Sequence, residues 1–267
     1  MRIVNIKGIP DFECIEYAPR QHNYVVIIPI INEGNRIHEE LKRSYISEIF
    51  NIADIVICDG GSTDDCTNES VLKSFNVNSL LIKEGDGKQG AQLRMGFYFA
   101  RERGYKGIIT IDGNNKDSIE DVPFFIKKIE EGYDFIQGSR FVRDGRAINT
   151  PFFRLISVRL IHAPIISLTA RKHFTDTTNA FRAYSAQYLF DERTSVFRDI
   201  FTGYELLAYL SVRATQLGYK ACEVPVTRAY PKNGKTPTKI SFYGNFNLLI
   251  ILLKNLFGKY KPNSKNE

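Results

Sequence analysis

Short apolar runs alternate with amphipathic stretches through the first half of the chain. Five runs rich in β-branched and other apolar residues predict buried strands, at residues 24–29, 53–58, 79–83, 107–111 and 133–137. Stretches with apolar residues at helical spacing predict helices at 39–50, 90–103 and 118–131. Strands that alternate with helices in this way are typical of a parallel sheet covered on both faces, so we expect an α/β fold.

Polar residues gather where the predicted strands end. Compact polar or glycine-containing loops follow four strands, at residues 29–33, 59–64, 112–117 and 138–140. Because ligands of such sheets bind beyond the carboxyl ends of the strands, we expect these loops to share one edge and to carry the site.

The pattern changes after Pro151. Mixed helical segments lead to a strand-like run at 221–226 and to an apolar, aromatic stretch at 240–257 with lysines on either side. One helical face of this stretch is approximated by Ile240, Phe242, Phe246, Leu249, Ile250, Leu253 and Phe257. Such a face either lies on anionic lipid or packs on the domain or a partner subunit, and we favour lipid.

Composition narrows the class of protein. A chain of 267 residues suits one α/β domain with an appendage. The net charge is +6, and from residue 228 onwards eight Lys or Arg face one acid, which favours a nucleotide, an anionic membrane or nucleic acid as partner over a merely solvated tail. The four cysteines lack zinc or redox spacing, and the first 19 residues lack a signal-peptide core, so we expect a reducing cytosol. No apolar run reaches the roughly 18–20 residues of a spanning helix, and the longest, 248–253, has six.

Two strand-end carboxylates could bind parts of a nucleotide. Asp59 opens a Gly-Gly loop and could accept from a base or ribose, although a simple turn between strand and helix explains it as well. Asp64 could cap the next helix. Asp112 could ligate a divalent cation on a diphosphate, or it could form an Asx turn.

Basic side chains add candidate phosphate ligands. The stretch 88–96 opens a helix whose start at Gly90 could face an anion, or it could be a surface cap. Arg140 and Arg154 could each bind a phosphate in a bidentate way, or they could be exposed to solvent. Arg154 lies in an apolar helical context, so we expect it to have a partner.

Taken together, these loops resemble family 2 glycosyltransferases of GT-A fold. The resemblance rests on residues 25–33, 59–64, 88–96, 112–114, 138–140, 176–182 and 218–226, in this order and spacing. The branch that the chain resembles most is that of the polyprenyl-phosphate sugar transferases of dolichol-phosphate mannose synthase type, over residues 24–258.

The resemblance implies roles for individual residues. Pro29, Glu33 and Asp59 would hold the nucleoside, and Asp112 with Asn114 would hold Mg²⁺ or Mn²⁺. Arg140 and Arg154 would bind the phosphate of a polyprenyl-phosphate acceptor. The donor would also contact basic residues on three segments, namely Lys88, Arg94, Lys116, Arg228 and Lys239.

Three departures from the family pattern bear on these roles. The second acid of the metal motif is Asn114, and the position of the following Gln is Lys116, so we expect weaker metal dependence with Lys116 partly replacing the cation. Val158 stands where the family usually has Ser, and Ile30 replaces a residue that stacks on the base.

The acceptor decides the mechanism. A lipid phosphate is already an anion and needs no base, and arginines would orient it. A sugar hydroxyl needs a carboxylate base, for which Asp176, with Glu205 second, is the candidate.

We therefore predict an inverting glycosyltransferase on the inner face of the cell membrane, with a mixed sheet, flanking helices and a C-terminal amphipathic appendage. The predicted segments are an extension at 1–23, the GT-A domain at 24–228 and a basic, amphipathic tail at 229–267. Alternatives are transfer to a saccharide or glycolipid hydroxyl, a nucleotidyltransferase and a non-catalytic nucleotide-sugar sensor. Nucleic acid is not expected, because acidic strand ends repel it. A homo-oligomer stays open.

Overall fold

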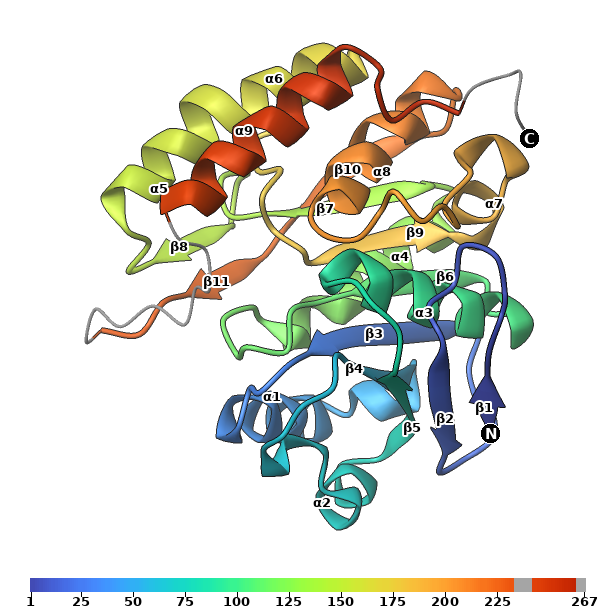
Figure 1. Cartoon of the computed structure of the whole chain (residues 1–267). Coiled ribbons are helices and arrows are strands. Elements are labelled where there is room, and N and C mark those ends of the chain that lie inside the picture. Colours follow the sequence, from blue (N-terminus) through green and yellow to red (C-terminus); the bar gives the residue numbers. More distant parts are fainter. Residues whose placement is uncertain (233–241, 263–267) are drawn as a thin grey trace.

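One large mixed sheet forms the centre of the molecule (Figure 1). The computed structural model describes residues 1–232 and 242–262, without the side chains of 242–246. The strand order is β1-β2-β5-β4-β3-β6-β9-β7-β10. The strands, in chain order, are β1 (Arg2–Ile3), β2 (Phe12–Glu16), β3 (Tyr24–Ile30), β4 (Asp54–Asp59), β5 (Val77–Lys83), β6 (Gly107–Thr110), β7 (Phe135–Ser139), β9 (Arg182–Ser185) and β10 (Ala221–Pro225).

The parallel strands end at one edge of the sheet. β5, β4, β3 and β6 pair in parallel, and β9 runs antiparallel between β6 and β7. Because β9 opposes both neighbours, β7 has the same direction as β6, and β10 is parallel to β7. The expectation that the four polar loops share one edge is therefore confirmed.

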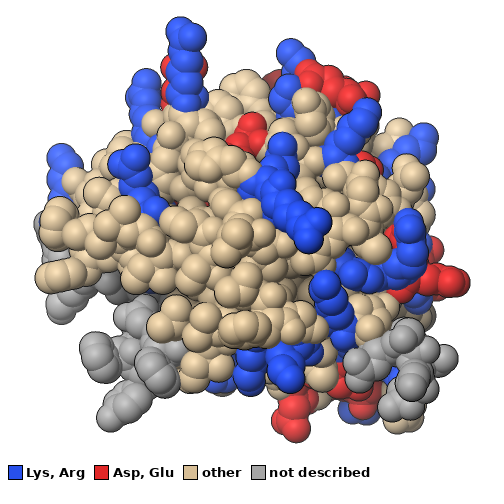
Figure 2. Space-filling view, turned by 90° about the horizontal axis from the view of Figure 1, so that it is seen from above, with Lys and Arg blue, Asp and Glu red and all other residues tan. Residues whose placement is uncertain are grey.

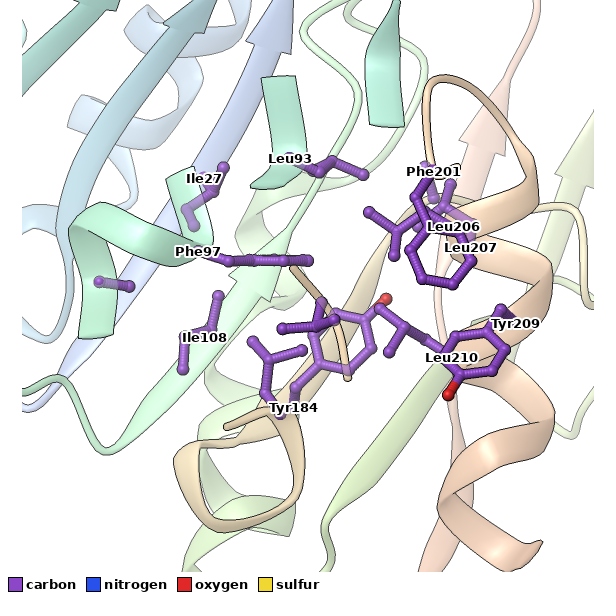
Figure 3. Close-up of a cluster of buried hydrophobic side chains, with 14 of the residues drawn as sticks. Ile27, Leu93, Phe97, Ile108, Tyr184, Phe201, Leu206, Leu207, Tyr209 and Leu210 are labelled. Carbon is purple, nitrogen blue, oxygen red and sulfur yellow. The ribbon is translucent and has the colours of Figure 1, made fainter. Parts of the chain in front are cut away.

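Helices cover both faces, as the strand and helix pattern predicts. One face lies under α1 (Asn35–Ile46), α2 (Glu69–Ser74) and α4 (Val122–Glu130). The other lies under α3 (Gln89–Glu102), α6 (Ala163–Ala170), α8 (Glu205–Gln216) and α9 (Phe242–Leu256), with the short α7 (Ala186–Leu189) at its end. The large apolar side chains of β3, α3 and α8 meet in this second core, where Phe97 lies between Ile27 and Tyr184 (Figure 3).

Several boundaries differ from the sequence expectation. The helix expected at 39–50 is α1 at Asn35–Ile46, followed by a 3₁₀ turn at Ile49–Asn51. Gly34 and Glu48 both have positive φ, and such residues break the helix at either end, so they set its bounds. The sequence pattern does not predict strand β9. Its Arg182 is fully buried, but a charged residue in a sequence does not indicate a buried strand.

The segment at 1–23 is not separate from the sheet. β2 pairs antiparallel with β5, and β1 pairs with β2. The division into three segments stays a prediction, but the N-terminal one supplies two strands of the domain's own sheet.

A continuous helix corrects the expectation that no segment is long enough to cross a membrane. α5 (Phe152–Ser157), a π-helical turn (Val158–His162) and α6 together form 19 residues. Among the described residues this is the one helix with the length and apolar composition for a span. Counting only uninterrupted apolar runs missed it, because Arg154, Arg159 and His162 interrupt the run without ending the helix.

A small second sheet lies beside the edge of the large sheet at which the parallel strands end. β8 (Arg146–Ile148) and β11 (Thr227–Ala229) pair in parallel. β11 follows β10 directly, so it carries the chain from the large sheet to the loops around Asp112.

Candidate active site

The loops after β3 and β4 are tied to each other. The Asp59 carboxylate accepts hydrogen bonds from the backbone N–H groups of Gly61 and Ser62, at 3.0 to 3.1 Å. Thr63 donates its N–H to the Asn32 side chain at 2.8 Å. Asp59 is buried and already accepts these bonds, so in this conformation it fixes the loop beside Pro29 and Glu33.

Asp64 has the capping role that was expected. Its side chain accepts from the N–H of Cys66 at 3.2 Å, as N-cap of a 3₁₀ turn, and from the N–H of Gly34 at 2.9 Å. The cap therefore also links the β4 loop to the start of α1.

The start of α3 is covered rather than open to an anion. A Cβ at Gly90 would lie 2.6 Å from the Gly203 carbonyl oxygen and 2.8 Å from that of Phe201. The glycine is thus required by close packing of the loop at 201–203. Of the two possibilities for this helix start, the geometry does not favour an anion site at Gly90.

The two basic residues of this segment lie in different surroundings. Lys88 is exposed at the helix start. Arg94 is buried and donates to the carbonyls of Gly8 and Phe201 and to the Asp199 carboxylate, so it ties the N-terminal loop to the 199–201 loop. Arg94 therefore lies apart from the Asp112 cluster, against its expected role at the donor.

Asp112 lies at the centre of a polar cluster beyond β6. Its Oδ1 accepts from the Gln89 side-chain amide at 2.8 Å. Its Oδ2 lies 3.4 Å from both the Asn114 amide nitrogen and Nη2 of Arg228. One carboxylate is thus shared by α3, the β6 loop and β11.

Arg228 is buried and doubly held. Its Nη1 donates to Asp117, which has no exposed surface, and to Asn179 Oδ1 at 3.3 Å. Burial opposes its charge, but Asp117 and Asp112 outweigh this and keep the pKa of Arg228 well above its ordinary value. Arg228 is therefore a permanent cation next to Asp112.

Tyr230 links this cluster to α5. Arg154 donates to the Tyr230 hydroxyl at 2.8 Å, so the partner expected for Arg154 exists. The Lys116 ammonium lies 5.2 Å from the Tyr230 ring centroid, and the Arg228 guanidinium carbon 5.8 Å. Burial raises the pKa of Tyr230, but Arg228 and Arg154 outweigh it and lower the value to about 8.

Arg140 and Asp176 form a buried pair between β7 and the segment before β9. Nε of Arg140 donates to Asp176 at 2.6 Å and Nη2 donates at 3.0 Å, and both side chains are almost fully buried. Burial opposes the charged carboxylate, but Arg140 lowers its pKa below the ordinary value. Asp176 is thus occupied, which favours holding Arg140 over acting as a base.

The second carboxylate considered as a base is also engaged. Glu205 accepts from the N–H groups of Thr202 and Gly203, the latter at 2.6 Å, at the first turn of α8. Its geometry is that of a helix-start acceptor.

The structure brings most of the expected site residues to one edge and leaves some elsewhere. Asp112, Asn114, Lys116, Arg154 and Arg228 belong to one connected cluster. Arg140 is electrostatically coupled to this cluster through Arg228 and Tyr230. Lys239, with the rest of the loop at 233–241, lies outside the described residues.

A divalent cation fits the chemistry of the cluster, as a weakly held ion. Gln89 Oε1 and Asn114 Oδ1 are buried and have no hydrogen-bond partner. With the Asp112 carboxylate they form a set of hard oxygen donors, as Mg²⁺ and Mn²⁺ prefer. Among the described residues, no group of three His, Cys, Asp or Glu side chains could hold a metal, and the set beside Asp112 has one carboxylate and two amide oxygens.

Sequence reasoning missed several members of the site. Gln89, Asp117, Asn179 and Tyr230 contact the expected residues, but each is an ordinary polar residue whose neighbours come from distant segments. Asp117 carried a weak signal, because it ends the same polar loop as Asp112.

Comparison with known proteins supports the expected resemblance. No protein-family profile matches the chain. Undecaprenyl-phosphate 4-deoxy-4-formamido-L-arabinose transferase of Edwardsiella ictaluri is 25% identical over 234 residues, which cover 85% of this chain and 64% of that protein. Undecaprenyl-phosphate mannosyltransferase of Micrococcus luteus is 28% identical, covering 76% of this chain and 82% of the relative. The chain thus spans less than two thirds of the first relative's length.

Solved structures decide the fold. Glucosyl-3-phosphoglycerate synthase of Mycobacterium tuberculosis, in complex with Mn²⁺, UDP and phosphoglyceric acid, superimposes with a TM-score of 0.60. The match covers 90% of this chain and 80% of that one, at 18% identity. The chain has the GT-A glycosyltransferase fold. The resemblance to polyprenyl-phosphate sugar transferases is confirmed by the relatives' names.

Proposed function

We propose that the protein is an inverting glycosyltransferase that moves a sugar from a UDP- or GDP-sugar to a polyprenyl phosphate at the inner face of the cell membrane. The observation that carries this is the connected cluster in which Asp112, Arg228, Tyr230 and Arg154 join the donor edge of the sheet to an exposed apolar helix. Named relatives act on undecaprenyl phosphate, which supports the same acceptor class here.

The donor would lie across the carboxyl ends of β3, β4 and β6. Pro29, Glu33 and Asp59 frame the nucleoside end, where the Asp59 loop is already fixed by its own hydrogen bonds. Arg228 and Lys116 lie at the diphosphate end beside Asp112. Preorganised cations at this point stabilise the charge that develops as the diphosphate leaves.

A divalent ion would be held by Asp112 with the amide oxygens of Asn114 and Gln89. When bound, it would add positive charge on the leaving diphosphate. Solved structures of the same fold contain Mn²⁺ with UDP, which supports a metal in this fold without identifying the ion here.

Two arginines suit an anionic acceptor. Arg140 has one guanidinium nitrogen, Nη1, with no hydrogen-bond partner although the side chain is buried, and such a donor suits a phosphate oxygen. Arg154 lies on the helix that would contact lipid and is held by Tyr230. Val158 is buried and its side chain has no polar atom, so this position does not supply the polar contact that Ser would.

The engagement of both carboxylates considered as bases favours the phosphate acceptor. A hydroxyl acceptor requires proton removal, but Asp176 is bonded to Arg140 and Glu205 to backbone N–H groups. A phosphate monoester is already an anion whose oxygens are nucleophilic, so in-line orientation by arginines suffices.

The helix Phe152–Ala170 and its neighbour α9 would contact the membrane. Phe153 and Leu160 are 85% and 71% exposed, and α9 packs beside α6 and ends near the exposed Phe257. Seen from this side, a broad uncharged surface has Lys and Arg side chains around and over it (Figure 2). Because the other side of the helix packs on the domain, the geometry favours lying in the interface over crossing the bilayer.

The test is label transfer from UDP- and GDP-sugars to undecaprenyl phosphate in detergent with Mn²⁺. We expect label in the organic phase with one donor, and its loss when Arg154 is replaced by Met. The matched control is Arg171→Met, an exposed arginine just past the end of the same helix. Donor breakdown without labelled lipid would move the acceptor to a saccharide, and no donor turnover would contradict the proposal.

A further inference from the structure

Arg228 differs from the other cations of the site in how it is fixed. The backbone on one side pairs with β8, where Arg228 lies opposite Ala147. On the other side it forms an antiparallel bridge with Asp117, and Ala229 donates its N–H to the Lys116 carbonyl at 2.8 Å. The residue is therefore held by backbone pairing on both sides and by Asp117 at its tip.

The tip of Arg228 reaches the carboxylate that would hold a metal ion. Its Nη2 lies 3.4 Å from Asp112 Oδ2, the same carboxylate that begins the metal motif. The motif itself has lost one acid to Asn114, and Lys116 stands two residues further on. The cluster thus contains three cationic side chains, Lys116, Arg154 and Arg228, against two carboxylates, Asp112 and Asp117.

We propose that Arg228 is a resident cation of the donor site, which holds the nucleotide diphosphate without a divalent ion and weakens metal binding at Asp112. This deepens the proposed function and rests on it, because it concerns the same donor. Lys116, to which the sequence assigned this role, lies over the Tyr230 ring. The divalent ion becomes an addition to the site rather than its requirement.

The physical reason is that a fixed guanidinium and a divalent cation compete for one carboxylate. A guanidinium held in place by the fold supplies charge and directed N–H donors to a phosphate. Two positive groups beside Asp112 also repel a further cation, so the affinity for Mn²⁺ is reduced.

The experiment measures binding rather than turnover. UDP and GDP are titrated by calorimetry into the wild-type protein and into Arg228→Met, each in EDTA and in Mn²⁺, and Mn²⁺ is titrated alone. Arg146→Met is the matched control, because Arg146 lies on the paired strand β8 opposite Thr227 but is exposed. Circular dichroism melting checks that the variants are folded.

We expect the wild type to bind one nucleotide in EDTA within about tenfold of its affinity in Mn²⁺. Arg228→Met is expected to lose roughly 10- to 100-fold of the EDTA affinity, as for loss of a charge-assisted hydrogen bond, and to bind Mn²⁺ more tightly. Arg146→Met should match the wild type in all arms.

Three results would overturn the inference. Wild-type nucleotide binding that requires Mn²⁺ would refute it while leaving the proposed function intact, and this arm decides even if Arg228→Met does not fold. Equal EDTA affinities of the wild type and a folded Arg228→Met would refute it too. No nucleotide binding in any condition would contradict both the inference and the proposed donor.

Discussion

Replacing Asp176 by Asn tests whether this carboxylate holds Arg140 or acts as a base. The Asp176 side chain has no exposed surface, and it accepts two bonds from Arg140 at 2.6 and 3.0 Å. Removing its charge leaves a buried guanidinium without its counter-ion, which costs about 3–5 kcal/mol of unfolding free energy. For a domain of this size, roughly 2–4 °C per kcal/mol predicts a drop in Tm of roughly 6–20 °C.

A surface pair of the same length provides the control. Lys73 and Glu69 also lie 2.6 Å apart, but their side chains are 52% and 63% exposed. Glu69→Gln should therefore cost only about 0.3–0.5 kcal/mol. The double variant Arg140→Met with Asp176→Leu should recover much of the stability, because no charge is left buried alone.

Thermal unfolding and the pH dependence of transfer decide between the two roles. We expect Asp176→Asn to lose stability and activity together, since Arg140 is misplaced, with no change in the shape of the pH profile. A variant with the Tm of the wild type, but with the acidic limb of its pH profile removed, would refute this reasoning and restore Asp176 as a base.

The other predictions concern pH, the acceptor arginine and lipid contact. The pKa of Tyr230 is lowered to about 8, so its ionised form stabilises the fold. The unfolding free energy of the wild type relative to Tyr230→Phe should therefore rise between pH 8 and 10, by at most about 2–3 kcal/mol. Denaturant titrations measure this difference, and a difference that does not change with pH would contradict the prediction. Burial lowers the pKa of His162 to about 4, so the wild type should lose stability relative to His162→Gln as pH falls from 6.5 towards 4. Phe153→Asp should reduce sedimentation with anionic vesicles several-fold without changing Tm, because this side chain is 85% exposed; unchanged sedimentation would place the contact elsewhere.

The sequence predicts the sheet well because its strands are continuous apolar runs. β3, β4 and β6 are almost entirely buried, so neither face needs a polar residue and each run is evident. Strand β9 was not predicted because Arg182 is a charged residue, which does not indicate a buried strand. In the structure Arg182 donates hydrogen bonds to four groups inside the protein. Its antiparallel insertion between β6 and β7 depends on tertiary pairing, which local patterns do not contain.

The site was predictable where one loop carries the chemistry and not where distant segments meet. Asp112, Asn114 and Lys116 lie on one strand end, so the sequence already shows the lost acid and the gained lysine. That Arg228 contacts Asp112 depends on the bridge between residues 117 and 228, which are far apart in the chain.

Buried charges were the hardest to assign. Arg94 was expected at the donor but ties two loops together, and Asp176, the candidate base for a hydroxyl acceptor, is paired with Arg140. A charged residue in a sequence does not reveal whether its partner is a ligand or another part of the same protein.

The central claim is that the acceptor is a phosphate, oriented by arginines without a base. The most direct measurement offers the protein undecaprenyl phosphate and undecaprenol in parallel, with the donor that it turns over and with the same detergent. We predict labelled lipid with the phosphate and none with the alcohol, with Arg154→Met losing the first. Transfer to the alcohol at a comparable rate would contradict the account, because it would require a base, and both Asp176 and Glu205 are already bonded within the protein.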